Sequence, residues 1–326
     1  MTPAMDCPYE IQPYAAELAG EWDDFVWNHS ANGNLFHTRE FLSYHPDERF
    51  KDASILLREH GRIVAVVAAN RTEVGWSSHS GTSCGGPVIS RQSCGVRTVQ
   101  AILEILNAHY QSKLGLRLCE PILGGTVNEL LLYLLHKTHA IQPEISAYKP
   151  LANIEDFVES IPHKKTRSAT RKCFRDGFAT QAAEDEADYR AFHQLLVTNL
   201  QGRHETEPTH TLEELLQLRR IIDTRQNLIL GRDAEGHLCT GVWLIEATPM
   251  CWHVQYIARD YSHTANCAVE ATLCKAMEAA RHAGAEHLNI GVCTESGGTV
   301  LNAGLLRFKE SLGCLHHNRH LITPKE

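Results

Sequence analysis

One pattern of residues occurs twice in this chain of 326 residues, first at 56–69 and again at 228–247. In each copy, two apolar runs flank a polar turn that contains a glycine, Gly61 in the first and Gly236 in the second. Short apolar runs joined by such a turn are typical of a β-hairpin. A helical pattern precedes each hairpin and another follows it, so the sequence predicts two copies of one α/β unit. Two such units packed together would offer a cleft between them, where ligands often bind.

The remaining segments extend this prediction through both halves of the chain. In the first half we expect helices at 13–30, 95–112 and 126–138, and strands at 88–89, 114–118 and 147–151. In the second half we expect helices at 153–160, 163–176, 185–201, 211–222, 266–283 and 300–312, and strands at 250–258, 286–290 and 314–322. Thr211 and Glu214 have the spacing of a capping box at one of these helix starts.

Composition places the chain among ordinary globular proteins, with 43% apolar and 21% charged residues. No apolar run approaches the roughly 18 residues that a membrane-spanning helix needs, and the acidic N-terminus predicts no signal peptide. The eleven cysteines include no C-x-x-C pair, which predicts reduced thiols in a cytoplasmic protein. The twenty histidines show no metal-ligand spacing, so no metal site is expected.

The basic residues are unevenly spread, although a formal net charge of −8 argues against a general nucleic-acid-binding protein. The segment 163–175 holds six Lys and Arg residues and no acidic residue. At helical spacing, four of them share one face: Lys164, Arg167, Arg171 and Arg175. Such a face is either a solvated outer surface or a patch for phosphates or an RNA backbone, and the sequence leaves both open.

Three segments carry a resemblance to a known family: the Gly-rich stretch 78–86, the strand segment 255–258 and, within 289–313, the most specific stretch 295–313. These segments resemble the FemAB-like branch of the GNAT superfamily, and the resemblance extends over nearly the whole chain. The resemblance implies an α/β fold of two tandem GNAT-like domains with mixed central sheets and a cleft between them. It places the first domain at 1–150, completed by 314–326, and the second at 151–313.

The resemblance also implies a reaction, the formation of an amide. Fem enzymes move an amino acid from aminoacyl-tRNA to an amine, originally on the peptidoglycan stem peptide, and related members act on small natural products. We therefore expect a cytoplasmic aminoacyltransferase with aminoacyl-tRNA and an amine-bearing small molecule or peptide as partners, and with neither cofactor nor metal. Two alternatives stay open: an acyl-CoA-dependent N-acetyltransferase acting on an amino sugar or amine, and a GNAT pair that binds a ligand without catalysis.

The choice of donor depends on one loop. A GNAT enzyme that uses acyl-CoA holds the pyrophosphate on backbone N–H groups of a Gly-rich loop at a helix start. The matching segment here, 259–266, contains no glycine, and the Gly-rich stretch 80–86 opens onto a strand. We therefore rank aminoacyl-tRNA above acetyl-CoA as the donor.

Three residues near the end of the chain are expected at the reaction centre. Lys309 matches a lysine that, in Fem-type enzymes, faces the tRNA end, where its charge stabilises the terminal phosphate or the developing oxyanion. Its alternative is a solvated helix lysine. Glu295 is a candidate acceptor for the proton of the attacking amine, or a helix-capping carboxylate. Asn302 is expected to bind substrate or to order the loop before the last helix.

Further substrate-binding candidates lie on the second half. Gln255 and Tyr256 are adjacent on the strand that separates from its neighbour in the GNAT fold, so one of them points into the cleft. His210 precedes a helix start, a natural anion site. There it replaces an arginine of Fem-type enzymes that act on nucleotide-linked peptides, which argues against a nucleotide-linked acceptor.

In the first half, His79 is a candidate general base from the Gly-rich loop, because imidazole titrates near neutral pH. His37 and Tyr44 are expected to bind substrate. Each of the three has a structural alternative, as a hydrogen-bonded histidine or an aromatic residue of the core.

Overall fold

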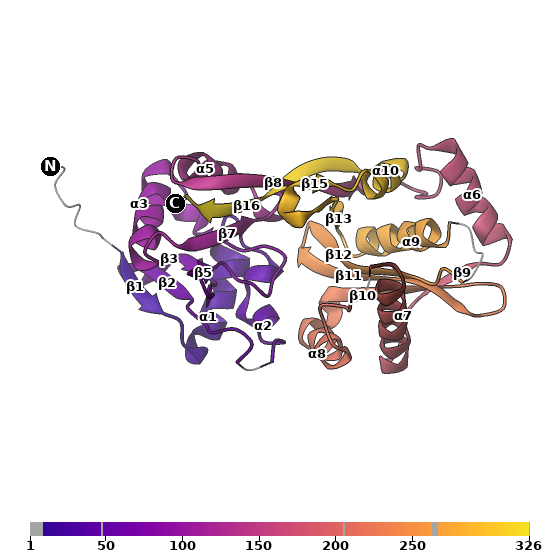
Figure 1. Cartoon of the computed structure of the whole chain (residues 1–326), viewed down its shortest axis with the longest axis horizontal. Helices are drawn as coiled ribbons and strands as arrows, with labels where there is room; N and C mark the ends of the chain where they lie inside the picture. Colours follow the sequence, from indigo (N-terminus) through magenta and orange to yellow (C-terminus); the bar gives the residue numbers. More distant parts are fainter. Residues whose placement is uncertain (1–8, 47, 205, 263–266, 326) are drawn as a thin grey trace. The chain divides into compact units, whose positions relative to one another are not determined.

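The computed structural model of the chain describes residues 9–46, 48–204, 206–262 and 267–325 (Figure 1). The chain divides into two compact units. Unit 1 comprises Met1–Ile145, Thr294–Val300 and Asn318–Glu326, and unit 2 comprises Ser146–Cys293 and Leu301–His317. The division falls within β8 (His139–Pro150) and β16 (Leu315–Pro324), so both strands contribute residues to both units.

Unit 1 contains the first predicted hairpin. β2 (Ile55–Glu59) and β3 (Arg62–Val67) pair antiparallel around a turn at His60 and Gly61, where Gly61 has a φ of +77°. β1 (Glu10–Pro13) and β6 (Pro87–Ile89) complete a four-stranded sheet of order β1-β2-β3-β6. The prediction of a hairpin at 56–69 is therefore confirmed.

Two helices close the core of unit 1. α3 (Val96–His109) and α5 (Val127–Leu135) bury aliphatic side chains at helical spacing against the strands. A second set of strands runs in the order β4 (Asn70–Arg71), β5 (Trp76–Ser77), β7 (Leu114–Leu118) and the unit 1 part of β16. The short elements are α1 (Ala19–Asp24), α2 (Arg39–Leu42), α4 (Pro121–Gly124), β14 (Thr294–Glu295) and β15 (Val300–Leu301), with single turns at Ala16–Leu18, Phe25–His29, Leu35–His37, Arg91–Ser93 and Ser296–Gly298.

Unit 2 contains the second predicted hairpin within a mixed sheet. In spatial order its strands are the Ser146–Pro150 part of β8, β13 (His287–Val292), β12 (Cys251–Arg259), β11 (Leu238–Thr248), β10 (Gln226–Arg232) and β9 (Ala179–Ala182). β10 and β11 pair antiparallel and form that hairpin, so this prediction is confirmed as well. β12 and β13 run parallel to each other.

Helices cover both faces of this sheet (Figure 1). α9 (Ala268–His282) lies on one face, and α7 (Glu186–His204), with α8 (Leu212–Ile222) beside it, lies on the other. A side chain at Gly231 would meet Thr272 of α9, and one at Gly241 would meet Phe192 of α7. Because side chains alternate along strands, these contacts place the two helices on opposite faces.

Two further helices frame unit 2. α6 (Lys164–Arg175) packs on α9 through the buried Cys173, and α10 (Ala303–Ser311) precedes β16. The predicted capping box at the start of α8 is confirmed, since Thr211 Oγ1 accepts from the Glu214 N–H at 3.2 Å and Glu214 Oε2 accepts from the Thr211 N–H at 2.9 Å. Within the described residues, no helix is long and apolar enough to cross a bilayer.

Candidate functional site

The parallel strands β12 and β13 of unit 2 separate part-way along their length. They pair only from Cys251–His287 to His253–Asn289. β12 nevertheless continues to Arg259 and β13 to Val292, each still paired with its other neighbour. Within the described residues, the facing edges of the two strands beyond His253 therefore have no ladder partner. On β13, the carbonyls of Ile290, Gly291 and Val292 accept from Lys309, and the Gly291 N–H donates to Asn289. The edge that faces another molecule with backbone polar groups is therefore that of β12.

Both strands are irregular where they separate. On β12, Tyr256 lies opposite Trp243 and Val254 opposite Leu244, so Gln255 is the extra residue of a bulge. A bulge re-aims side chains and is common beside active sites. Gln255 Oε1 is buried and has no hydrogen-bond partner among the described residues. The bulge therefore supplies a buried amide oxygen able to accept a hydrogen bond.

Tyr256, the next residue, is tied to the start of α8. Its hydroxyl lies 2.5 Å from His210 Nδ1, and its ring stacks on Trp243 with 6.4 Å between centroids. Burial raises the pKa of Tyr256 to about 12, so the phenol is neutral near pH 7 and shares a hydrogen bond with His210 Nδ1. The carbonyl of His210 in turn accepts from His193 Nε2 at 3.1 Å. The two predicted residues Tyr256 and His210 thus form one pair.

Lys309 of α10 is buried, with 3% of its surface exposed. Its ammonium donates to three consecutive carbonyls of β13, those of Ile290 (2.9 Å), Gly291 (2.8 Å) and Val292 (3.0 Å). Consecutive carbonyls of a regular strand point in opposite directions, but Gly291 has a φ of +78°, which lets all three turn toward one ammonium. Lys309 therefore fixes the shape of β13 where it leaves β12. Its expected role opposite the donor stays a prediction.

Two other predicted residues lie near the ends of the segment before α10. Asn302 caps α10, because its side-chain oxygen accepts from the Leu305 N–H at 2.9 Å, and its own N–H donates to the Cys293 carbonyl at 2.9 Å. Asn302 therefore orders this part of the chain. Glu295 is exposed at the end of β14 and belongs to unit 1.

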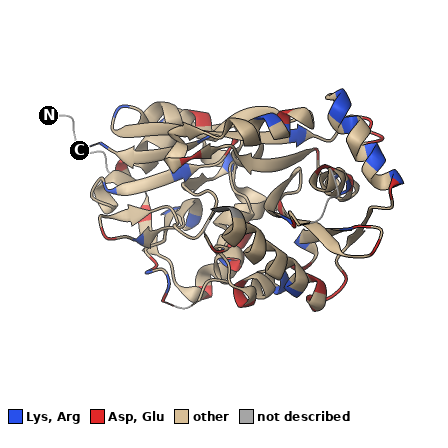
Figure 2. Ribbon diagram, turned by 45° about the vertical axis from the view of Figure 1, so that its right-hand side comes forward, with Lys and Arg blue, Asp and Glu red and all other residues tan. Residues whose placement is uncertain are grey.

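The four predicted phosphate-binding residues lie on α6, where Figure 2 shows Lys and Arg recurring along the helix. Lys164 and Arg175 are exposed and form no ion pair with any described residue. Arg171 is exposed and pairs with Glu159. Arg167 is half-buried, and its Nη1 donates to the Ile161 carbonyl at 2.6 Å. The opposite side of α6 packs beside Ala268 and Ala271 in the first turn of α9. The basic face is therefore carried on a helix anchored at the start of α9.

The predicted CoA-binding position before α9 is described only in part. Of the segment 259–266, residues 263–266 lie outside the described residues. Arg259 is positioned over the ring of Tyr261, with its guanidinium 4.9 Å from the ring centroid. Cys267, the residue before α9, provides no side-chain cap.

Two predicted residues of unit 1 hold the Gly-rich loop. The carbonyl of Gly81 accepts from Tyr44 Oη at 3.4 Å and from His45 Nε2 at 3.0 Å, and His79 Nδ1 accepts from the Gly81 N–H at 3.1 Å. Burial, with smaller contributions from His45 and Arg39, lowers the pKa of His79 to about 4. His79 is therefore neutral near pH 7, and Tyr44 lies in the core with 3% of its surface exposed.

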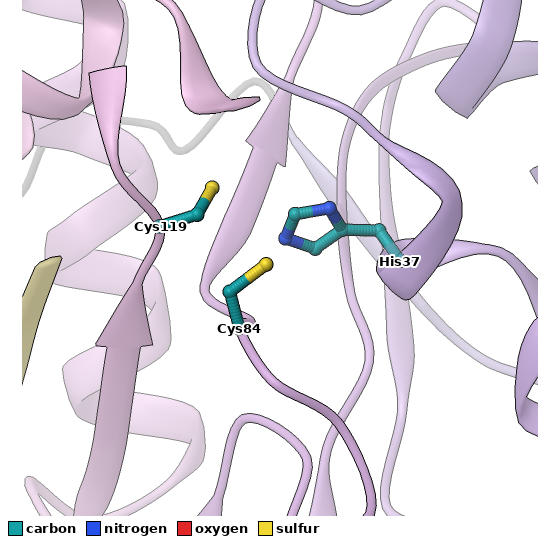
Figure 3. A group of neighbouring side chains, drawn as sticks. All are labelled: His37, Cys84 and Cys119. Carbon is teal, nitrogen blue, oxygen red and sulfur yellow. The ribbon is translucent and has the colours of Figure 1, made fainter. Parts of the chain in front are cut away.

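His37, the remaining predicted residue of unit 1, lies beside two thiols, Cys84 and Cys119 (Figure 3). Burial lowers the pKa of His37 to about 4, opposed by hydrogen bonds to the backbone of Gly85 and Asn34. Burial also raises the pKa of the Cys84 thiol well above its ordinary value, with a further contribution from Cys119. Sequence reasoning missed this group, because its members come from three distant segments and share no spacing signal.

Comparisons with known proteins support one fold. The sequence matches no protein-family model, and no curated protein is significantly similar to it. FemX has a TM-score of 0.69 at 14% identity, with 97% of both chains covered. The L-PGS structure from Bacillus licheniformis has a TM-score of 0.62 at 14% identity, with 97% of this chain and 93% of that chain covered.

A third structure is described as a tandem GNAT protein from the clavulanic acid biosynthesis pathway. It has a TM-score of 0.53 at 11% identity, with 98% of this chain and all 100% of that chain covered. The expected α/β fold with mixed sheets, which these structures share over nearly the whole chain, is thereby confirmed.

Proposed function

We propose that this chain is an aminoacyltransferase that moves an amino acid from aminoacyl-tRNA to an amine on a small molecule or peptide. The observation that carries the proposal is the separation of β12 and β13 beyond His253–Asn289 in unit 2. An acyl group placed between the strands meets the β12 edge, whose backbone polar groups beyond His253 have no β13 partner among the described residues. Fixed N–H donors at a reacting carbonyl stabilise the oxyanion that develops during acyl transfer.

Lys309 supports this site as a positioning residue. Its three hydrogen bonds hold the β13 backbone in the conformation in which it leaves β12. The strand must be rigid, because an acyl donor displaced by about 1 Å from its position facing the attacking amine loses much of the rate gained by positioning. In the proposed enzyme, Asn302 contributes in the same way, by capping the helix that carries Lys309.

The pair of Tyr256 and His210 supplies groups able to move a proton. Amide formation removes a proton from the attacking amine and delivers one to the leaving ribose oxygen of the donor. The neutral phenol and the imidazole are 2.5 Å apart, close enough to pass a proton between them. We place this pair beside the acyl group, and keep His79 and Glu295 as candidate proton acceptors and Tyr44 as a candidate acceptor-binding residue. His37, also expected to bind substrate, is turned instead toward two buried thiols.

Two features favour an aminoacyl donor. The unpartnered Oε1 of Gln255 is suited to accept a hydrogen bond from the α-ammonium of an aminoacyl group, which an acetyl group lacks. The basic face of α6 is anchored at the start of α9 and offers Lys164 and Arg175 to phosphates. Acetyl-CoA remains the alternative donor, and ligand binding without catalysis the alternative activity.

Binding measurements with matched ligands test the donor. We expect aminoacyl-tRNA to bind about tenfold more tightly than the same tRNA without its amino acid, and Gln255→Leu to remove this difference. Gln12→Leu is the matched control, because Gln12 lies in unit 1 and accepts a hydrogen bond from Arg58. This variant should preserve the difference in affinity between the two tRNAs. Calorimetry with acetyl-CoA should give no binding in the micromolar range. Micromolar acetyl-CoA binding, together with equal affinity for the two tRNAs, would reverse the order of the donors.

A further inference from the structure

Three potential metal ligands converge in the interior of unit 1 (Figure 3). They are His37 of the turn Leu35–His37, Cys84 of the loop before β6 and Cys119 directly after β7. One ligand atom from each lies within 4.8 Å of the other two. All three residues are buried, with 2–3% of their surface exposed.

These donor atoms suit one type of cation. Two cysteine sulfurs and one imidazole are soft or borderline ligands, which favour Zn²⁺ over Mg²⁺ or Ca²⁺. Zinc binds sulfur at about 2.3 Å and nitrogen at about 2.0 Å, so ligand atoms around it lie roughly 3.5–4 Å apart. The observed group needs only small side-chain movements to reach that spacing. We propose that His37, Cys84 and Cys119 bind one Zn²⁺ ion.

Buried amides next to the sulfurs provide the hydrogen bonds that thiolate ligands need. Asn34 Nδ2 donates toward both sulfurs, at 3.7 Å to Cys84 and 3.4 Å to Cys119. Asn128 Nδ2 donates toward the Cys119 sulfur at 3.7 Å. Both amides are held in place, since Asn34 Oδ1 accepts from the Phe36 N–H and Asn128 Oδ1 accepts from Asn32. Such outer groups orient metal ligands and tune their charge.

The imidazole contributes through the edge that Figure 3 shows turned toward the sulfurs. Its Nδ1 accepts from the Asn34 N–H at 3.3 Å, the long end of hydrogen-bond distances. Ligation through the other nitrogen moves the ring proton to Nδ1. The imidazole then gives up this contact and its hydrogen bond to the Gly85 backbone in exchange for the metal bond. Within the described residues no fourth His, Cys, Asp or Glu joins the group. The fourth position is therefore open to water or a small ligand.

Metal content of the full chain tests the proposal. Protein purified under reducing conditions and exposed to Zn²⁺ should retain about one ion per chain after gel filtration. Cys84→Ser/Cys119→Ser should retain less than about a tenth of that amount. Two variants serve as controls and should bind as wild type. Cys94→Ser removes a half-buried thiol of unit 1. His237→Gln removes an exposed member of the second group of possible ligands, Asp233, Glu235 and His237.

Cobalt provides a second measurement that does not depend on the variants folding. Co²⁺ added to the wild-type chain should give a thiolate charge-transfer band in the near ultraviolet, and Zn²⁺ should abolish it. Wild-type protein that neither retains zinc nor shows this band overturns the proposal. Retention of the ion by a folded double variant, or its loss from either control, overturns it as well.

Discussion

Replacing Lys309 by methionine tests whether its ammonium shapes β13. Methionine keeps an unbranched apolar side chain and removes the charge and the N–H donors. A hydrogen bond from a charged donor contributes about 1.5–3 kcal/mol, so three such bonds contribute roughly 4.5–9 kcal/mol before offsets. Relief from burying an ammonium offsets several kcal/mol of this. We expect the free energy of unfolding to fall by about 2–4 kcal/mol.

Lys149 is the matched control for this substitution. It lies in the same unit and is equally buried, with 4% of its surface exposed. Its ammonium donates to one described carbonyl, that of Leu312 at 2.9 Å, and burial lowers its pKa. The stabilisation from this one hydrogen bond is offset by the free-energy cost of burying the ammonium. Lys149→Met should therefore change the free energy of unfolding by less than about 1 kcal/mol.

Urea unfolding of both variants measures the difference. Tryptophan fluorescence reports on both units, through Trp22 in unit 1 and Trp243 and Trp252 in unit 2, and far-ultraviolet circular dichroism reports on the whole chain. Lys309→Met should also reduce turnover, because β13 is no longer held where it leaves β12. If the two variants are equally stable to within about 0.5 kcal/mol, Lys309 does not hold β13 and the reasoning fails.

Three further predictions address other parts of the molecule. Lys164→Ala/Arg175→Ala should weaken aminoacyl-tRNA binding and reduce the slope of log affinity against log salt concentration by about 1.5. The control Lys172→Ala removes a lysine paired with Asp176 and should leave the slope unchanged. If the double variant has the same slope as the wild type, α6 is a solvated face. Tyr256→Phe should lower kcat by about tenfold to a hundredfold with little change in stability, and wild-type kcat in the folded variant would remove the hydroxyl from the reaction. His79 has a pKa of about 4 in the folded chain, below the ordinary 6.5. The unfolded chain therefore binds more protons, and His79 lowers stability by up to about 3 kcal/mol as the pH drops from 6.5 to 4. His79→Gln should make this part of the urea-midpoint profile less steep, with the similarly lowered pKa of His37 supplying the remaining slope, and parallel profiles would contradict the assignment.

Local patterns predicted most of the elements. The two hairpins, the strand Leu114–Leu118 and the capping box of Thr211 and Glu214 depend on turn chemistry and short-range periodicity, which the sequence contains directly. The helix expected at 153–160 does not form. Asn153 has a φ of +60°, and the Asp156 carboxylate accepts from the N–H groups of Val158 and Glu159 in a turn. Such local side-chain bonds compete with a helix.

The features of the candidate site were harder to predict because they depend on register and distant contacts. The bulge at Gln255 exists only relative to the pairing of β11 and β12, which periodicity does not specify. On its own helix, Lys309 has the pattern of a surface lysine. Its burial depends on the carbonyls of β13, 17–19 residues earlier, and on the turn of that strand at Gly291. The group of His37, Cys84 and Cys119 likewise forms only when three separate segments meet. The prediction that no metal binds was drawn from local spacing alone.

Transfer of label from the donor tests the central proposal most directly. Purified protein would be incubated with a panel of amines and either radiolabelled aminoacyl-tRNA or radiolabelled acetyl-CoA, and the amide product counted with and without RNase pretreatment of the donor. We predict label in an amide from aminoacyl-tRNA, its loss after RNase, and none from acetyl-CoA. Product from acetyl-CoA that is insensitive to RNase, with none from aminoacyl-tRNA, would contradict the proposed function.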